Sequence, residues 1–154
     1  MSHYSITLPG STECIHEART WVHDTLGENQ GVDDAVLVAS ELATNAIRHS
    51  ASGRPGGTFT LHVAAFSDRW HVRVDDAGGL NVPRIQAVDD DQDEAGRGLA
   101  MVASLSLRWG VFGDYHARGV WADVPTPNSV SSDDESEAYF PLLNNLESGA
   151  IRHC

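Results

Sequence analysis

Apolar residues recur along the first 127 residues with two periods, one typical of helices and one typical of strands. The helical period predicts three helices, one from a cap at Ser11 or Thr12 to Leu26, one from Val32 to His49 and one from Gly98 to Arg108. The β-prone runs predict strands at Tyr4 to Leu8, Thr58 to Phe66, Trp70 to Asp76, Val111 to Tyr115 and Val120 to Val124. Short connections join the last four strands in pairs, so the pattern predicts two antiparallel hairpins that build one sheet.

The second predicted helix carries three polar side chains on one face. Glu41, Asn45 and His49 are four residues apart, and at about 3.6 residues per turn they lie on the same side of a helix. A neighbouring face is apolar and consists of Leu37, Val38, Leu42, Ala46 and Ile47. The segment therefore predicts a helix that buries one side and presents an acid, an amide and an imidazole along another.

The polar face of this helix suits a site for a metal-bound nucleotide. Glu41 could orient or deprotonate an attacking hydroxyl group. The oxygen of Asn45 is a hard ligand suited to Mg²⁺, which combines a few protein oxygens with substrate phosphates. His49 is expected to form a hydrogen bond near the helix end, with direct catalysis as the alternative. For all three residues, a solvated stripe on a surface helix is the competing interpretation.

Asp76 ends a predicted strand as a carboxylate at the rim of the core. The period of two places it on the same face as Val72 and Val74, whereas Asp75 turns outward with Arg73. A buried carboxylate needs a partner, and the exocyclic amine and ring nitrogen of adenine would provide one. The alternative is that Asp76 only closes an Asx turn with the two glycines that follow Ala77.

A long polar segment, residues 77–97, precedes the third predicted helix and contains the acidic run 89–94. Loops of this length in a compact domain are usually functional. Gly96-Arg97-Gly98-Leu99 stands where this segment meets the helix, and the unpaired N–H groups and positive dipole end of a helix attract phosphate. Glycine there allows close approach of the backbone, although paired glycines often only end a loop.

Composition and charge narrow the class of protein. The 154 residues suffice for one domain, and the serine-rich acidic composition after Pro127 predicts a domain at 1–127 and a flexible acidic tail at 128–154. The 22 acidic residues against 10 arginines give a formal charge of −12, which argues against nucleic acid or anionic membrane and favours a basic protein partner. With no export signal or apolar span, the expected location is the cytoplasm. Cys14 and Cys154 are expected to be reduced thiols, because they show neither a disulfide framework nor metal-ligand spacing.

The order of these motifs resembles the ATPase superfamily of gyrase, heat-shock chaperones, mismatch-repair ATPases and histidine kinases. Within it the chain is most similar to the compact actinobacterial form of the anti-sigma-factor serine kinases, over roughly residues 4 to 125. The resemblance implies an α+β fold, a two-layer α/β sandwich in which helices pack on one face of a mixed, mostly antiparallel sheet. It also implies ATP and Mg²⁺ bound between the acid-amide helix and a lid.

The resemblance assigns roles to individual residues. It implies that Glu41 is the general base, that Asn45 binds magnesium with the nucleotide, and that Asp76 recognises adenine beside Gly78, the first glycine of that motif. Gly96, Gly98 and Leu99 match the second glycine motif, which cradles phosphates, and Arg97 is a candidate for stabilising charge there. One departure is that Leu80 stands where the last glycine of the first motif belongs. An alternative register that starts at Asp75 restores that glycine but loses the first and points the carboxylate outward.

Two functions compete on this basis. The first is a serine/threonine protein kinase that transfers the γ-phosphate of Mg-ATP to an anti-sigma-antagonist protein and that also sequesters a sigma factor. A homodimer is a separate expectation. Positioning and charge neutralisation would account for catalysis of this kind. The second is a non-catalytic binding module in which nucleotide gates the sequestration of a sigma factor or regulator. Leu80 and the acidic lid favour the second.

Overall fold

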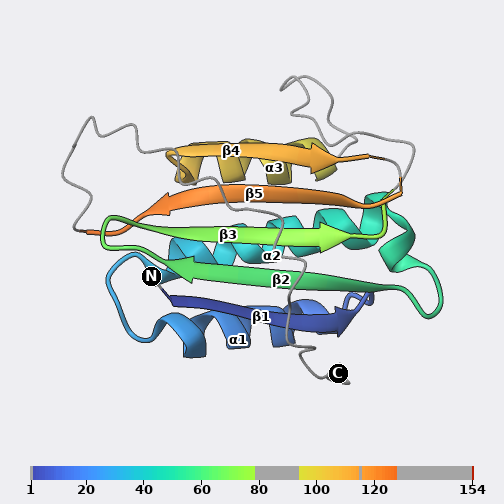
Figure 1. Cartoon of the computed structure of the whole chain (residues 1–154), viewed down its shortest axis with the longest axis horizontal. Coiled ribbons are helices and arrows are strands. Elements are labelled where there is room, and N and C mark those ends of the chain that lie inside the picture. The colour runs from blue at the N-terminus through green and yellow to red at the C-terminus, as the bar shows by residue number, and fades with distance from the viewer. Residues whose placement is uncertain (1, 79–93, 115, 128–153) are drawn as a thin grey trace.

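An antiparallel sheet and a layer of helices form the computed structural model, which describes residues 2–78, 94–114, 116–127 and 154 (Figure 1). The strands are β1 (Ser2–Pro9), β2 (Thr58–Ala65), β3 (Arg69–Asp76), β4 (Arg108–Gly113) and β5 (Arg118–Pro125). The helices are α1 (Cys14–Leu26), α2 (Val32–His49), α3 (Glu94–Leu105) and the short 3-10 helix η1 (Ala51–Gly53). For residues 94–97 only the backbone is described.

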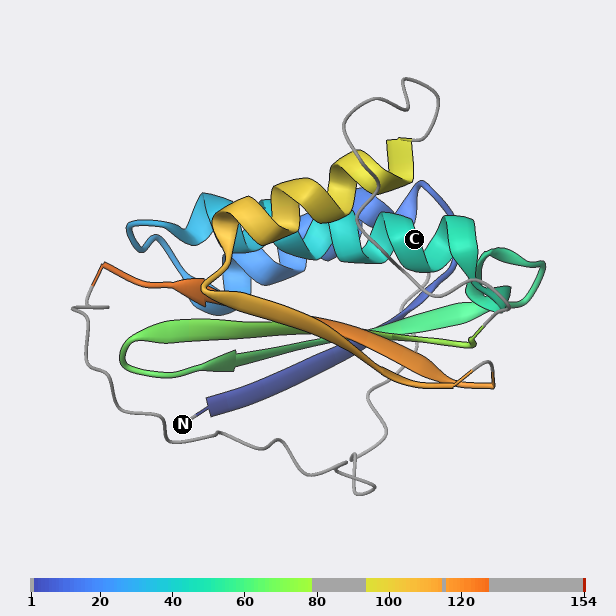
Figure 2. The same ribbon diagram turned by 90° about the horizontal axis from the view of Figure 1, so that it is seen from above.

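The five strands are arranged in the order β1-β2-β3-β5-β4, and each neighbouring pair is antiparallel. Alternation of side chains divides β3 between two faces: Val72 and Val74 are buried, whereas Arg73 and Asp75 pair with each other on the opposite face. Figure 2 shows α1, α2 and α3 on one side of the sheet. The predicted α+β sandwich with helices on one face is therefore confirmed.

Helix α2 lies at the centre of the helical layer and contacts α1, α3 and β3. Its side chains at helical spacing, among them Val38, Leu42 and Ala46, are buried in one hydrophobic cluster with the inner face of the sheet. The cluster also takes in Leu61 of β2 and Val72 of β3. Because apolar residues hold α2 on this side, its polar residues remain on the side that faces α3 and the end of β3.

Element boundaries agree best where the hydrophobic period is strongest. The structure places α2 at Val32–His49, as predicted. Helix α3 starts at Glu94, four residues before the predicted start, and β4 starts at Arg108, inside the predicted helix. The β4 ladder extends in this direction because Leu107 N–H donates to the carbonyl of Asp123 at 2.8 Å. The predicted helix from Gly98 to Arg108 is thus displaced towards the N-terminus.

The two cysteines are bonded to each other, so the expectation of reduced thiols is wrong for this structure. A disulfide joins Cys14, fully buried in the first turn of α1, to Cys154, with their Cα atoms 5.5 Å apart. A separation of 140 residues carries no spacing signal, which is why the sequence did not reveal the pair. Residues 128–153 lie outside the described part, so the boundary at residue 127 stays a prediction. Among the helices that are described, none has the length and hydropathy of a membrane span.

Candidate functional site

The C-terminal half of α2 carries the predicted acid and amide. Glu41 is half-buried, and Asn45 is only 7% exposed. The Nδ2 atom of Asn45 is buried and has no hydrogen-bond partner within the described structure. Buried amide groups are nearly always hydrogen-bonded, so an unused donor beside Glu41 marks a position where a ligand would complete the contacts. These features do not fit a solvated surface stripe.

Glu41 lies directly against the glycine motif of α3. A Cβ atom built on Gly98 would lie 2.5 Å from Oε2 of Glu41 and 3.5 Å from its Cδ. Only glycine at this position leaves the carboxylate undisturbed, because carbon and oxygen atoms do not approach so closely without a bond. Gly98 therefore permits the close approach of α2 and α3 at Glu41.

The other predicted glycine-motif residues are distributed along the start of α3. Gly96 and Arg97 belong to its first turn, and the position of the Arg97 side chain lies outside the description. Leu99 is 3% exposed and belongs to the core cluster rather than to a free loop. The first turn of α3, residues 94–97, is the part with unpaired N–H groups, and of the predicted phosphate cradle it contains Gly96 and Arg97.

Asp76 is a buried carboxylate at the end of β3, as the strand period predicts, and is 8% exposed. Its Oδ1 accepts a hydrogen bond of 2.6 Å from the N–H of Gly78, whose φ of 78° is in the left-handed region that favours glycine. The turn interpretation of Asp76 is therefore correct for one oxygen. Burial raises the pKa of Asp76, against the lowering effects of the Gly78 N–H and a nearby arginine.

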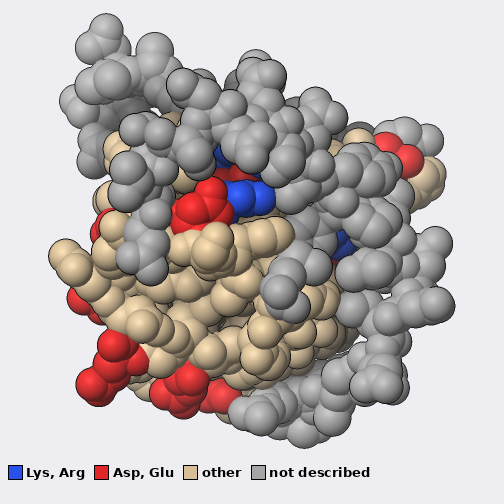
Figure 3. Space-filling view, turned by 60° about the vertical axis from the view of Figure 1, so that its left-hand side comes forward, with Lys and Arg blue, Asp and Glu red and all other residues tan. Residues whose placement is uncertain are grey.

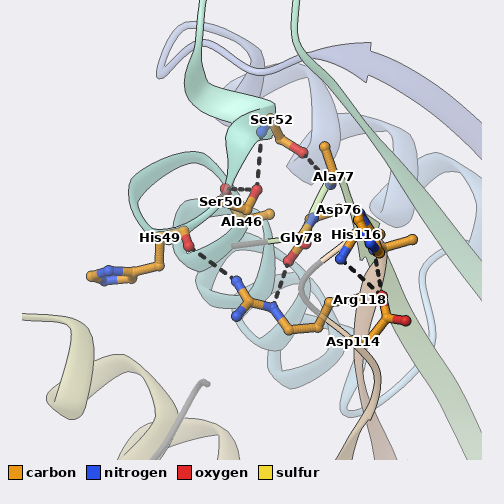
Figure 4. Close-up of polar contacts among 11 residues, drawn as sticks. Ala46, His49, Ser50, Ser52, Asp76, Ala77, Gly78, Asp114, His116 and Arg118 are labelled. Carbon is orange, nitrogen blue, oxygen red and sulfur yellow. Dashed lines mark hydrogen bonds and ion pairs between the residues drawn. The ribbon is translucent and has the colours of Figure 1, made fainter. Parts of the chain in front are cut away.

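That arginine is Arg118, which the sequence interpretation missed. It is 4% exposed, and its Nε lies 3.4 Å from Oδ2 of Asp76. Its Nη2 donates a hydrogen bond of 3.0 Å to the backbone carbonyl of His49, while the imidazole of His49 points away from the guanidinium (Figure 4). The sequence places Arg118 in a predicted turn, but the structure makes it the first residue of β5, directly opposite Asp76. A search for a cation on the strand that pairs with β3, opposite the buried acid, would have found it.

The segment after α2 fixes the backbone that follows Asp76. Ser50 Oγ donates to the carbonyl of Ala46 at 2.6 Å, and Ser52 Oγ accepts from the N–H of Ala77 at 2.9 Å. The N–H of Ala51 donates to the carbonyl of Gly78 at 2.9 Å. Figure 4 shows this connection between η1 and the end of β3. The first glycine of the predicted nucleotide motif is thus held by α2 and η1 together.

The hydrogen bond of His49 near the helix end is the one that its backbone carbonyl accepts from Arg118. The Nε2 atom of its imidazole is buried without a hydrogen-bond partner among the described residues. The residue in place of the last glycine, Leu80, and the acidic run 89–93 lie outside the described residues. The register that starts at Asp75 is not favoured, because Asp75 pairs with Arg73 at 2.6 Å on the outer face.

Acidic side chains outnumber basic ones on the face drawn in Figure 3, where they occupy several separate places. The blue arginine atoms visible there form small areas, one of them beside an acidic group. This distribution agrees with the formal charge of −12. A partner that docks on this face by charge would have to be basic.

Comparison with known proteins gives three results. The sequence profile of the histidine kinase-like ATPase domain matches residues 10–119. The curated proteins contain no match to the chain. Among solved structures, a chain of the SiaB-SiaC complex from Pseudomonas aeruginosa is similar with a TM-score of 0.48 and 19% sequence identity, over 79% of this chain and 89% of that chain.

Proposed function

The chain belongs to the histidine kinase-like ATPase domain family, and on this premise we propose that it binds Mg-ATP and phosphorylates a serine or threonine of a regulatory protein partner. The partner class that the motifs suggest is an anti-sigma-antagonist, with sigma-factor binding as an accompanying activity. A cytoplasmic location and a homodimer are part of the same proposal.

The order of groups along α2 is the observation that carries this proposal. Glu41 lies against Gly98 of α3, Asn45 follows one turn later, and the carbonyl of His49 meets the Arg118–Asp76 pair. At 1.5 Å per residue, the eight steps from Glu41 to His49 span about 12 Å. A nucleotide with its base at Asp76 and its phosphates at the start of α3 would have its magnesium near Asn45 and its terminal phosphate near Glu41.

The residues present fit a magnesium nucleotide. The Nδ2 of Asn45 is a donor without a partner among the described residues, which suits an acceptor atom of a ligand. Its amide oxygen is an atom of the type that Mg²⁺ prefers. Gly98 lets the start of α3 lie directly against the Glu41 carboxylate with no side chain between them. Asp76 presents a buried carboxylate, which suits the exocyclic amine of adenine. When bound, Mg-ATP supplies the transferable phosphoryl group and neutralises its developing charge.

In the proposed reaction Glu41 accepts the proton of the partner's hydroxyl group. The hydroxyl oxygen then forms a bond to the γ-phosphorus as the bond to the bridging oxygen breaks, and ADP departs with that electron pair. Asn45 holds the metal end of the nucleotide, and the first turn of α3 binds phosphate oxygens through its N–H groups. General-base catalysis of this kind contributes about 10²- to 10⁴-fold in rate.

The test is phosphoryl transfer from radiolabelled ATP to a candidate antagonist protein, comparing Glu41→Gln with Glu28→Gln. Glu28 is an exposed residue in the connection between α1 and α2, so its substitution removes the same charge away from the site. We expect transfer to fall at least 100-fold in Glu41→Gln, with nucleotide affinity nearly unchanged, and to persist in Glu28→Gln. Equal transfer by the two variants would contradict the role of Glu41.

The second candidate is a nucleotide-gated binding module without transfer. Leu80 at the last position of the first glycine motif favours it, because a side chain there would crowd a nucleotide that glycine admits. Nucleotide binding without label on any tested partner supports the module over the kinase. Failure to bind ATP at all would contradict both functions.

A further inference from the structure

Arg118 makes two contacts that join elements distant in the sequence. It starts β5, its Nε faces Oδ2 of Asp76 at the end of β3, and its Nη2 donates to the carbonyl of His49 at the end of α2. The side chains of both members of the ion pair are almost completely buried, with 3% and 1% exposed. A guanidinium group out of water is retained only where paired acceptors compensate for its lost hydration.

In both contacts the positive guanidinium group lies against a negatively charged or electronegative group that lacks a donor. The last carbonyls of a helix have no partner within the helix and form its negative end, so a cation at the carbonyl of His49 stabilises the end of α2. The carboxylate of Asp76 accepts one N–H from Gly78, and its second oxygen needs a donor or a positive charge. One guanidinium meets both requirements and ties the end of β3 to α2.

We propose that Arg118 is a positioning residue for the nucleotide base, which keeps the Asp76 carboxylate charged and oriented beside α2. This inference rests on the proposed nucleotide-binding function and identifies a residue outside its recognised motifs. The Nε of Arg118 faces the carboxylate and its Nη2 donates to α2, so the action proposed for it is on Asp76. The base would then contact an Asp76 carboxylate that is already ionised before the nucleotide binds.

Among the described groups around Asp76, Arg118 is the cation whose positive charge favours the ionised carboxylate. Its neighbour Asp75 raises the pKa of Asp76 by charge but is itself paired on the outer face with His62 at 3.0 Å and Arg73 at 2.6 Å. From α2, the carbonyl of His49 faces the guanidinium. In the turn between β4 and β5, Asp114 accepts the N–H groups of His116 and Ala117, so its carboxylate serves that turn. From η1, Ser52 contributes a hydroxyl, which does not titrate in this range.

The direction of the effect follows from burial. Burial already raises the pKa of Asp76, and removal of the guanidinium would raise it further. Because the ionised carboxylate is the stronger acceptor for an adenine amine, the acid side of the nucleotide-binding profile should move to higher pH in a variant without the charge. One unit of such a shift lowers affinity up to tenfold at pH values below both midpoints.

The experiment compares Arg118→Gln, Arg118→Lys and Arg54→Gln with the unchanged full chain. Arg54 is exposed just after η1 and controls for loss of an arginine near the site. Two quantities are measured from pH 3 to 8: the ¹³C chemical shift of the Asp76 carboxyl, assigned with Asp76→Asn, and the affinity for a fluorescent ATP analogue. The carboxyl titration needs no nucleotide, and near-ultraviolet circular dichroism verifies folding.

We expect Arg118→Gln to raise both midpoints together by at least one pH unit. Arg118→Lys keeps the positive charge and should reverse most of that rise, and Arg54→Gln should change neither midpoint. An unchanged Asp76 titration, or an affinity loss in Arg118→Gln that is the same at every pH, would overturn the inference while leaving nucleotide binding established. If Arg118→Gln does not fold, Arg118→Met, which also removes the charge but keeps an apolar stem, decides by the same midpoints. Absence of nucleotide binding by the unchanged chain at every pH refutes the proposed function and this inference with it.

Discussion

A methyl group added at Gly98 should lower the rate of phosphoryl transfer, which depends on Glu41, while leaving the free energy of unfolding nearly unchanged. The Cβ of Gly98→Ala would lie 2.5 Å from Oε2 of Glu41, below the 3.0 Å at which something must move. The obstructing atom is the far end of a flexible side chain, and no backbone atom of a neighbouring element lies within 4 Å among the three nearest. We therefore expect the Glu41 carboxylate to rotate away while α2 and α3 keep their packing.

The magnitudes of the two effects differ widely. Alanine favours a helix over glycine by about 1 kcal/mol, and moving Glu41 off its preferred rotamer costs about 0.5 to 1.5 kcal/mol. These terms oppose each other, so the free energy of unfolding should change by less than about 1 kcal/mol. A catalytic group displaced by about 1 Å loses about 100-fold in rate, so phosphoryl transfer should fall by about that factor.

Urea unfolding and transfer of labelled phosphate, measured on Gly98→Ala and Ser104→Ala, test this expectation. Ser104 is an exposed residue of the same helix and serves as the matched control. In a double-mutant cycle with Glu41→Ala, the effect of Gly98→Ala on transfer should disappear, because the displaced group is already absent. Full transfer in Gly98→Ala, or a stability loss of several kcal/mol, would refute the reasoning.

Two further predictions concern stability. Cys154→Ser should lower the free energy of unfolding by about 2 to 4 kcal/mol without reductant, because the bond to Cys14 restrains the unfolded chain, and chemical denaturation should show no such difference after reduction of both proteins. Burial opposes ionisation of Asp123, but hydrogen bonds from His71 at 2.6 Å and Arg108 at 2.7 Å outweigh it and lower its pKa, so its stabilisation is present above the ordinary aspartate pKa and lost on acidification. Asp123→Asn should therefore cost about 1 to 3 kcal/mol at pH 7, and urea titrations at falling pH should show the difference from the unchanged chain shrinking below about pH 4; a constant difference would contradict this.

The sequence was most informative where one physical signal dominated. For α2, apolar residues at helical spacing and the glycine and serine residues at its ends all indicate the same boundaries, so the whole helix was predicted. Asp76 was placed on the inner face by counting alternate residues from Val72 and Val74, and the structure buries it there. In both cases the signal is local, because it depends on spacing within one element.

Predictions failed where contacts between elements overrule local preference. Two glycines at positions 96 and 98 disfavour a helix start, but Leu99 and Val102 are buried, and their packing keeps these residues in α3. Glycine also disfavours a strand interior, so the sequence predicts a turn at Gly119. In the structure it lies in β5, where a Cβ would meet Cζ of Phe112 at 2.1 Å, so this glycine permits a close side-chain approach.

Because the glycine at 119 indicates a turn, the sequence interpretation also places Arg118 in that turn and misses its role. A turn residue is exposed by expectation, whereas the first residue of β5 lies opposite Asp76 in the ladder. Once the strand is extended by two residues, parity places the guanidinium and the carboxylate on the same inner face, and burial of either charge alone would be costly. The two interpretations of Asp76 then cease to compete, because one oxygen shapes the turn at Gly78 and the other is paired with Arg118. A base bound there would meet a carboxylate that the turn orients and the arginine keeps charged.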